Sequence, residues 1–204
     1  MERANEVLEF WFGRGPWDAA RLAERSAFWF GGDETAAERD ALVRSSLEPM
    51  LERAARGEFA SWAASPKRRL ALIILFDQVP RNAYRGTAAA FAFDREALAL
   101  SVEGLQLAAD AALDPIERLF FYLPLEHAES MEAQDTAVTS FQRLVAEAPE
   151  ALKPFCENTL KYARQHRDII AKFGRYPYRN RVLGRESTPA EIEWLAAQAD
   201  RFGQ

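Results

Sequence analysis

Apolar residues recur along this chain at the period of an α-helix, and the alternation typical of a β-strand is scarce. The pattern predicts short helices near residues 7–12 and 18–30, the second ending at Gly31 and Gly32. Asp33 is expected to cap a long helix that ends at Gly57.

The middle of the chain contains a strongly apolar helix bounded by two prolines. Pro66 can open it, since proline is tolerated in the first helical turn. The helix must end near Val79, because Pro80 disfavours a helical conformation in the residue before it. Thr87 is expected to cap the following helix, which runs through Leu107.

Two later helices have stronger start signals. Asp114-Pro115-Ile116-Glu117 and Thr188-Pro189-Ala190-Glu191 are both capping boxes with proline in the first turn. Further helices are expected near 131–147 and 150–173, and Gly174 closes the second of them. The sequence therefore predicts one all-α domain over residues 1–204, with roughly nine helices in antiparallel pairs that form an irregular bundle or a short solenoid.

Composition narrows the class of protein. The 204 residues are 49% hydrophobic and 28% charged, as in a soluble globular domain. The net charge of −5 argues against a general nucleic-acid binder. The longest apolar runs, such as residues 70–76, are too short to cross a bilayer, and no signal peptide is visible at the start. With a single cysteine, Cys156, we expect a cytoplasmic protein without disulfides.

Two segments gather hydrogen-bond donors in similar order. The first Arg-Asn segment (residues 80–86) contains Arg81, Asn82 and Arg85. The second Arg-Asn segment (residues 177–185) contains Arg179, Asn180 and Arg185. Each is expected to be a loop that follows a helix, and guanidinium and carboxamide donors on rigid loops suit the recognition of carboxylate or phosphate.

The second segment lies in the most basic part of the chain. Residues 169–185 contain five basic side chains and no acid, with three aromatic residues between them. Such a pattern can bind single-stranded nucleic acid, a phosphate ligand or an acidic peptide, or it can pair with carboxylates of other helices. The acidity of the remaining chain argues against nucleic acid.

The first segment follows an acid. Asp77 ends the apolar helix, so we expect it to be buried and paired with Arg81 or Arg85. Such a pair can simply fix the turn, and it would leave the other arginine for a ligand.

A third set of residues could supply acid/base chemistry. Pro124 is expected to interrupt a helix and to bring Glu126 and His127 together, and His166 is the second histidine of the chain. Each histidine is also compatible with a purely structural role. No HExxH spacing or cysteine pair indicates a metal, and no nucleotide-binding glycine motif indicates a cofactor. Cys156 lies on an apolar helix face and is expected to be a buried thiol.

Several of these motifs together resemble the signature of domain-of-unknown-function family 924. The segments that carry the resemblance are 7–13, 72–82, 85–86, 90–94, 121–127, 166–168, 173–177, 179–180 and 183–185. Val79 stands where the family pattern usually has phenylalanine, which affects packing more than chemistry. The resemblance implies a tetratricopeptide-like helical fold and supplies no substrate.

Three functions follow as hypotheses. The first is a site that binds a small anionic ligand or an acidic peptide through the six donors of the two Arg-Asn segments, with Glu126, His127 and His166 lining it. The second is an enzyme that uses His127 or His166 as acid or base and arginines to stabilise negative charge. The third is a protein-interaction scaffold, which would expose a broad apolar groove. The sequence does not fix the oligomeric state.

Overall fold

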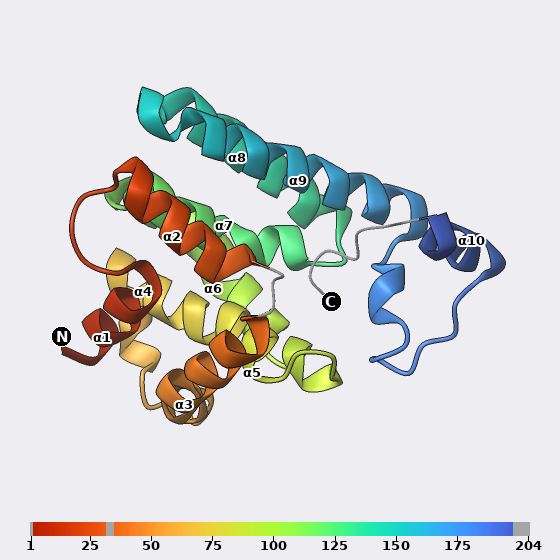
Figure 1. Ribbon diagram of the computed structural model, residues 1–204, viewed down its shortest axis with the longest axis horizontal. Coiled ribbons are helices and arrows are strands. Elements are labelled where there is room, and N and C mark those ends of the chain that lie inside the picture. Colours follow the sequence, from red (N-terminus) through yellow and green to blue (C-terminus); the bar gives the residue numbers. More distant parts are fainter. Residues whose placement is uncertain (1, 32–34, 198–204) are drawn as a thin grey trace.

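The described part of the chain is mostly helical (Figure 1). The computed structural model describes residues 2–31 and 35–197, and these ranges contain no β-strand. The α-helices are α1 (Glu2–Phe12), α2 (Ala19–Phe30), α3 (Ala36–Ala55), α4 (Pro66–Ile73), α5 (Val79–Ala83), α6 (Asp94–Gln106), α7 (Pro115–His127), α8 (Met131–Glu147), α9 (Lys153–Phe173) and α10 (Pro189–Ala197). With α4 and α5 counted as one continuous helix, the described part of the chain has nine, which confirms the all-α prediction.

Side-chain caps mark several of the predicted helix starts. The Asp18 side chain accepts from the Arg21 N–H at 2.8 Å and so caps α2. Glu117 accepts from the Asp114 N–H at 2.9 Å, which begins α7. The predicted helices near 131–147 and 150–173 correspond to α8 and α9, and α9 ends at Gly174 in the left-handed conformation.

Two helix starts predicted from capping residues, Thr87 and Asp33, are not confirmed. Thr87 precedes only a short 3₁₀-helix, η3 (Ala88–Phe91), and its hydroxyl donates to the Tyr84 carbonyl at 2.7 Å instead of capping a long helix. The long helix α6 begins later, at Asp94. The predicted cap Asp33 lies outside the described residues, and α3 begins after Thr35.

The prediction that the apolar helix ends near Val79 is wrong. After α4 the chain makes a π-helical turn, η2 (Ile74–Gln78), and continues directly into α5. The Val79 N–H donates to the Ile74 carbonyl in this wider turn, so Pro80 falls in the first turn of α5, where a missing N–H is tolerated. The first half of the first Arg-Asn segment is therefore helical, and Asp77 lies in the π-helical turn.

Pro124 does not break its helix either. α7 continues through Pro124 to His127, so the predicted interruption does not occur. This helix is buried on nearly all sides, and such tertiary packing overrides local propensity. The Ser101 hydroxyl of α6 donates to the Phe121 carbonyl at 2.7 Å, close to the proline.

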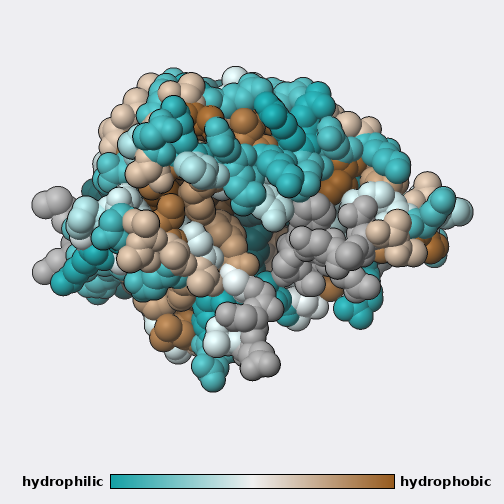
Figure 2. Space-filling model, turned by 45° about the horizontal axis from the view of Figure 1, so that its top comes forward, coloured by the Kyte–Doolittle hydropathy of each residue, from teal (hydrophilic) through white to brown (hydrophobic). Residues whose placement is uncertain are grey.

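α7 is the centre of the packing. It contacts α4 and α6 on one side and the antiparallel pair α8–α9 on the other (Figure 1). Most of the core is one continuous apolar cluster from α1 to α9, and a smaller cluster of Ile169, Ile170 and Tyr176 joins the end of α9 to α10. Polar side chains cover most of the α8–α9 ridge in the view of Figure 2.

The described helices include none that is long and apolar enough to cross a membrane. That the whole chain forms one domain stays a prediction.

Replacing Gly104 with alanine is expected to destabilise the protein by about 1–3 kcal/mol. A Cβ at this position of α6 would overlap the Phe121 ring of α7 and lie 2.8 Å from Arg69 Cδ. Helix propensity alone would favour alanine by only about 1 kcal/mol. Urea denaturation measures the difference, and Val102→Ala, at an exposed position of the same helix, is the control that keeps native packing. A Gly104→Ala variant as stable as the wild type would contradict this packing.

Candidate functional site

Two histidine–carboxylate pairs lie at the end of α7. His127 Nδ1 is 2.7 Å from Asp77 Oδ1, and His166 Nδ1 is 3.1 Å from Glu126 Oε1. Glu126 and His127 are adjacent in the sequence, but each faces a partner from another element. The prediction that they pair with one another is therefore not what the structure contains.

Asp77 is the most deeply buried acid of this group, with 1% of its side chain exposed. The Gln78 side chain donates to Oδ2 at 2.6 Å, and Arg81 Nη1 lies 3.2 Å from Oδ1. Burial alone would raise the pKa of Asp77, but Arg81 and His127 outweigh it and hold the pKa at about 2. Asp77 is thus an ionised acceptor, buried and paired with Arg81 as the sequence predicts.

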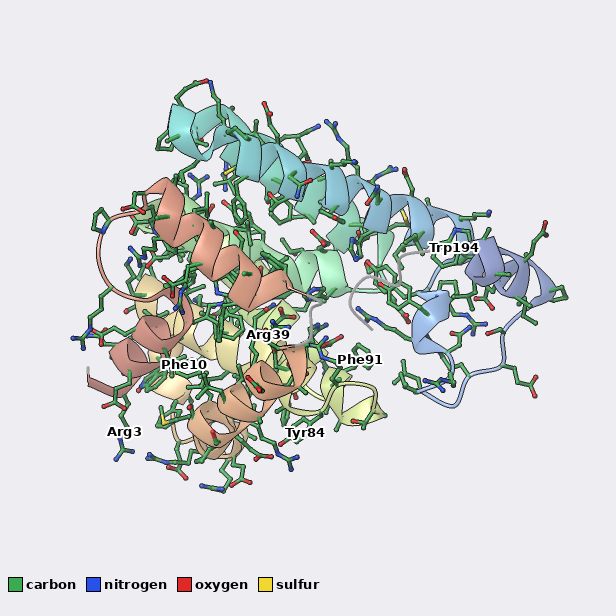
Figure 3. The ribbon with its side chains drawn as sticks, viewed as in Figure 1. Arg3, Phe10, Arg39, Tyr84, Phe91 and Trp194 are labelled. Atoms are coloured by element: carbon green, nitrogen blue, oxygen red, sulfur yellow. The ribbon has the colours of Figure 1, made fainter. Side chains whose placement is uncertain are left out.

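The two Arg-Asn segments meet at a third acid. Asp94 Oδ1 is 2.8 Å from Arg81 Nη1, and Asp94 Oδ2 is 3.5 Å from Arg179 Nη1. The Phe91 ring lies against both guanidinium groups, with its centroid 5.7 Å from Arg81 Cζ and 4.6 Å from Arg179 Cζ. Figure 3 shows Phe91 on the side of the molecule where α5 faces the second Arg-Asn segment.

We call the side chains that gather here the Asp77 cluster; its members are Asp77, Arg81, Asp94, Glu126, His127, His166 and Arg179. Sequence reasoning missed Asp94 as a member, and it missed the covering ring of Phe91. Their only signal in the sequence was their position within residues 90–94, which carry part of the family resemblance.

Several polar atoms of the cluster have no hydrogen-bond partner among the described residues. Arg81 Nη2 and Arg179 Nε are buried donors without an acceptor, and Asp94 Oδ1 makes no hydrogen bond although Arg81 Nη1 lies 2.8 Å away. His127 donates or accepts only through Nδ1, and 16% of its side chain is exposed. Since Asp77 is ionised and can only accept, it fixes the proton of the imidazole on Nδ1 and leaves a lone pair on Nε2.

The second pair is more deeply enclosed. His166 Nδ1 also lies 3.0 Å from the Tyr162 carbonyl, and burial lowers the pKa of His166 to about 3. Burial and the negative charge of Asp77 raise the pKa of Glu126 to about 8. At pH 7 we therefore expect a neutral imidazole and a protonated carboxyl group. The Gln134 amide and the Tyr176 hydroxyl both donate to the Glu126 backbone carbonyl.

Asn82 and Arg85, predicted as donors in the first segment, bind other parts of the protein. Asn82 Nδ2 donates to the Gln78 carbonyl at 2.8 Å. Arg85 forms a bidentate pair with Asp40 of α3, at 2.6 and 3.0 Å. Arg81 is therefore the residue by which this segment enters the Asp77 cluster.

The second segment is divided in the same way. Asn180 Nδ2 donates to Ser187 Oγ at 3.0 Å and lies 3.3 Å from Glu191 Oε2. Arg185 pairs with both oxygens of Glu129, at 2.6 and 2.9 Å, and donates to Asn180 Oδ1 at 2.9 Å. These contacts fasten the segment to α10 and to the turn between α7 and α8, and Arg179 is the residue by which this segment enters the cluster.

Other candidate sites are less suitable for chemistry. Among the described residues no group of three His, Cys, Asp or Glu is placed to hold a metal ion. Cys156 is buried, and burial raises the pKa of its thiol to about 11. A cavity of about 640 Å³ lies between α1, the start of α7 and residues 149–152, and no member of the Asp77 cluster lines it. The cluster is the better candidate because its groups are titratable, oriented and partly unpaired.

The stability of the protein is expected to fall between pH 6.5 and 8 by about 1 kcal/mol. Glu126, with its pKa raised from 4.5 to about 8, keeps a proton in the folded state that the unfolded chain has lost, so stability declines as pH rises through this range. His166, with its pKa lowered from 6.5 to about 3, opposes this decline mainly below pH 7, where the unfolded chain still binds a proton at this residue. Denaturation at several pH values measures the slope.

Glu126→Gln, which mimics the protonated carboxyl group, should remove this slope. Glu132→Gln, at an exposed position of α8, should leave it unchanged. A wild-type free energy of unfolding that stays constant from pH 6.5 to 8 would show that Glu126 is ionised throughout.

The pKa of His127 is expected to respond to its two charged neighbours with opposite signs. Burial lowers this pKa most, Arg81 lowers it further, and Asp77 opposes them. Asp77→Asn should therefore lower it and Arg81→Gln should raise it, while Arg85→Gln should leave it unchanged. The chain has two histidines, so imidazole NMR titration can assign each signal with one further variant. Shifts of the opposite sign would mean that another contact controls this ring.

The chain is similar to bacterial proteins along nearly its full length. Residues 7–199 match the family described as "Bacterial protein of unknown function (DUF924)". The solved structure of a protein of unknown function, ATU0120 from Agrobacterium tumefaciens, is 34% identical, with a TM-score of 0.77 over 96% of this chain and 97% of that one. No curated protein shows significant similarity. The chain belongs to the DUF924 family of bacterial proteins of unknown function.

Proposed function

We propose that this protein is an enzyme in which His127 acts as the general acid or base on a small anionic substrate. The observation that carries the proposal is the Asp77–His127 contact of 2.7 Å, in a histidine that keeps 16% of its side chain exposed. A carboxylate that accepts a hydrogen bond from Nδ1–H orients the imidazole and leaves Nε2 available for proton transfer. Asp77 is here a positioning residue, because it acts through His127.

The two arginines supply the expected affinity for an anion. Arg179 Nη1 donates to the His127 carbonyl at 3.1 Å, so its guanidinium lies beside the proposed acid or base. Arg81 Nη2 and Arg179 Nε are donors that no described residue uses. Donors fixed in a water-poor environment stabilise negative charge that develops during a reaction.

His166 is the weaker choice for the acid or base. It is buried against the Tyr162 carbonyl, and the low pKa of its imidazole makes it a poor proton acceptor near pH 7. We therefore propose that Glu126 and His166 have a structural role and hold the cluster in place.

The other functional hypotheses become narrower. Of the six predicted donors, only Arg81 and Arg179 stay candidates for anion binding. The other four bind partners outside the Asp77 cluster, whereas Arg81 and Arg179 each keep one N–H group without an acceptor. Capture of an acidic peptide terminus, the interaction scaffold, the tetratricopeptide-like relationship and a cytoplasmic location stay predictions.

A panel of small phosphate monoesters and carboxylates, followed by NMR in deuterated water, tests for turnover or proton exchange. His127→Asn should reduce the rate at least about 100-fold, and Asp77→Asn roughly 10- to 1000-fold. Arg85→Gln, whose pair with Asp40 lies outside the cluster, is the control that keeps activity.

Diethyl pyrocarbonate gives a readout that does not depend on knowing the substrate. It should modify His127 faster than His166, because Nε2 of His127 has no described partner and the side chain is partly exposed. Equal or reversed modification rates, or turnover that survives His127→Asn, would contradict the assignment of His127 as the acid or base.

A further inference from the structure

One carboxylate of the protein itself occupies the space between the two arginines. Asp94 places one oxygen 2.8 Å from Arg81 and the other 3.5 Å from Arg179, as the oxygens of a bound anion would be placed. The second distance is long for a charge-assisted hydrogen bond, so this bridge is incomplete.

Asp94 is also the most accessible of the three side chains. A quarter of it, 25%, is exposed, against 12% for Arg81 and 5% for Arg179. It is the first residue of α6, at the end of the short segment that also carries Phe91 over the guanidinium groups. Displacement of the Asp94 carboxylate would leave Asp77, which lies on η2, with its own contacts to Gln78, Arg81 and His127.

The charges of the cluster show what an incoming ligand must provide. Arg81 is already neutralised by Asp77, at 3.2 Å, whereas Asp94 is the only carboxylate within salt-bridge distance of Arg179 among the described residues. Without Asp94, the cluster would therefore carry an unpaired buried cation, which is strongly unfavourable. A ligand that displaces Asp94 must be an anion.

The donors show which anion fits best. Arg81 Nη2 and Arg179 Nε have no partners, and Asp94 Oδ1 makes no hydrogen bond although Arg81 Nη1 lies 2.8 Å away, so this carboxylate fits the two guanidinium groups poorly. A phosphoryl group has three terminal oxygens and can accept from both guanidinium groups at once.

We propose that Asp94 holds the place of a phosphoryl group, and that a small phosphate-bearing substrate displaces it to bind Arg81 and Arg179 beside His127. This inference names the substrate class of the proposed function and rests on it. Asp94 then acts as an internal competitor: it keeps the arginines paired when the substrate is absent and weakens the binding of anions that cannot use more donors than it does.

Titration with inorganic phosphate tests the inference directly. By calorimetry, Asp94→Asn should bind phosphate roughly tenfold more tightly than the wild type, since a hydrogen-bonded charge no longer competes. Glu96→Gln removes a charge from the same first turn of α6 at an exposed position, and should bind as the wild type does. Adding Arg179→Met to Asp94→Asn should abolish the gain. Equal affinity in Asp94→Asn, Glu96→Gln and the wild type, or a gain that survives loss of Arg179, overturns the inference.

A second measurement uses the unaltered protein, in case Asp94→Asn does not fold. The Arg179 Nε–H resonance should shift saturably with phosphate and not with chloride at equal ionic strength, because this donor has no described partner. Absence of a saturable shift also overturns the inference. Failure of the proposed catalysis is distinguishable: phosphate would still bind, but His127→Asn would leave turnover unchanged.

Discussion

The buried carboxylate of Asp77 is the constraint around which the candidate site is arranged. An ionised acid with 1% of its side chain exposed is tolerated only when charged and hydrogen-bonded partners compensate for lost hydration. Arg81, His127 and Gln78 supply these contacts, and they come from η2, α5 and the end of α7. The same contacts that keep Asp77 ionised therefore hold the imidazole of His127 in one orientation, so stability and proposed chemistry share one interaction.

Charge balance explains the second histidine–carboxylate pair. Two aspartates already match two arginines in the cluster, and another ionised carboxyl group near Asp77 would be repelled. Glu126 therefore keeps its proton, with a pKa raised by burial and by Asp77 to about 8. Its neighbour His166 stays neutral for the related reason that burial disfavours its cation.

Local sequence signals predicted the helices well and the site only in part. Capping boxes act over a few residues, so the starts of α7 and α10 could be read directly. Pro80 and Pro124 misled because a π-helical turn and complete burial override local proline rules. Adjacent helical residues point in different directions, so Glu126 and His127 could not face one another. The Arg179–Asp94 contact spans 85 positions, and no local pattern encodes it.

The two Arg-Asn segments do share one design, although it is not the six-donor pocket that their sequences indicate. In each, the asparagine fastens its own segment, to the Gln78 carbonyl or to Ser187, and the preceding arginine reaches the common cluster. Two cations from distant parts of the chain thereby converge on Asp94. Asp94 is partly exposed and bridges the two arginines incompletely. It is therefore the member of this tightly paired cluster that another anion can replace most easily.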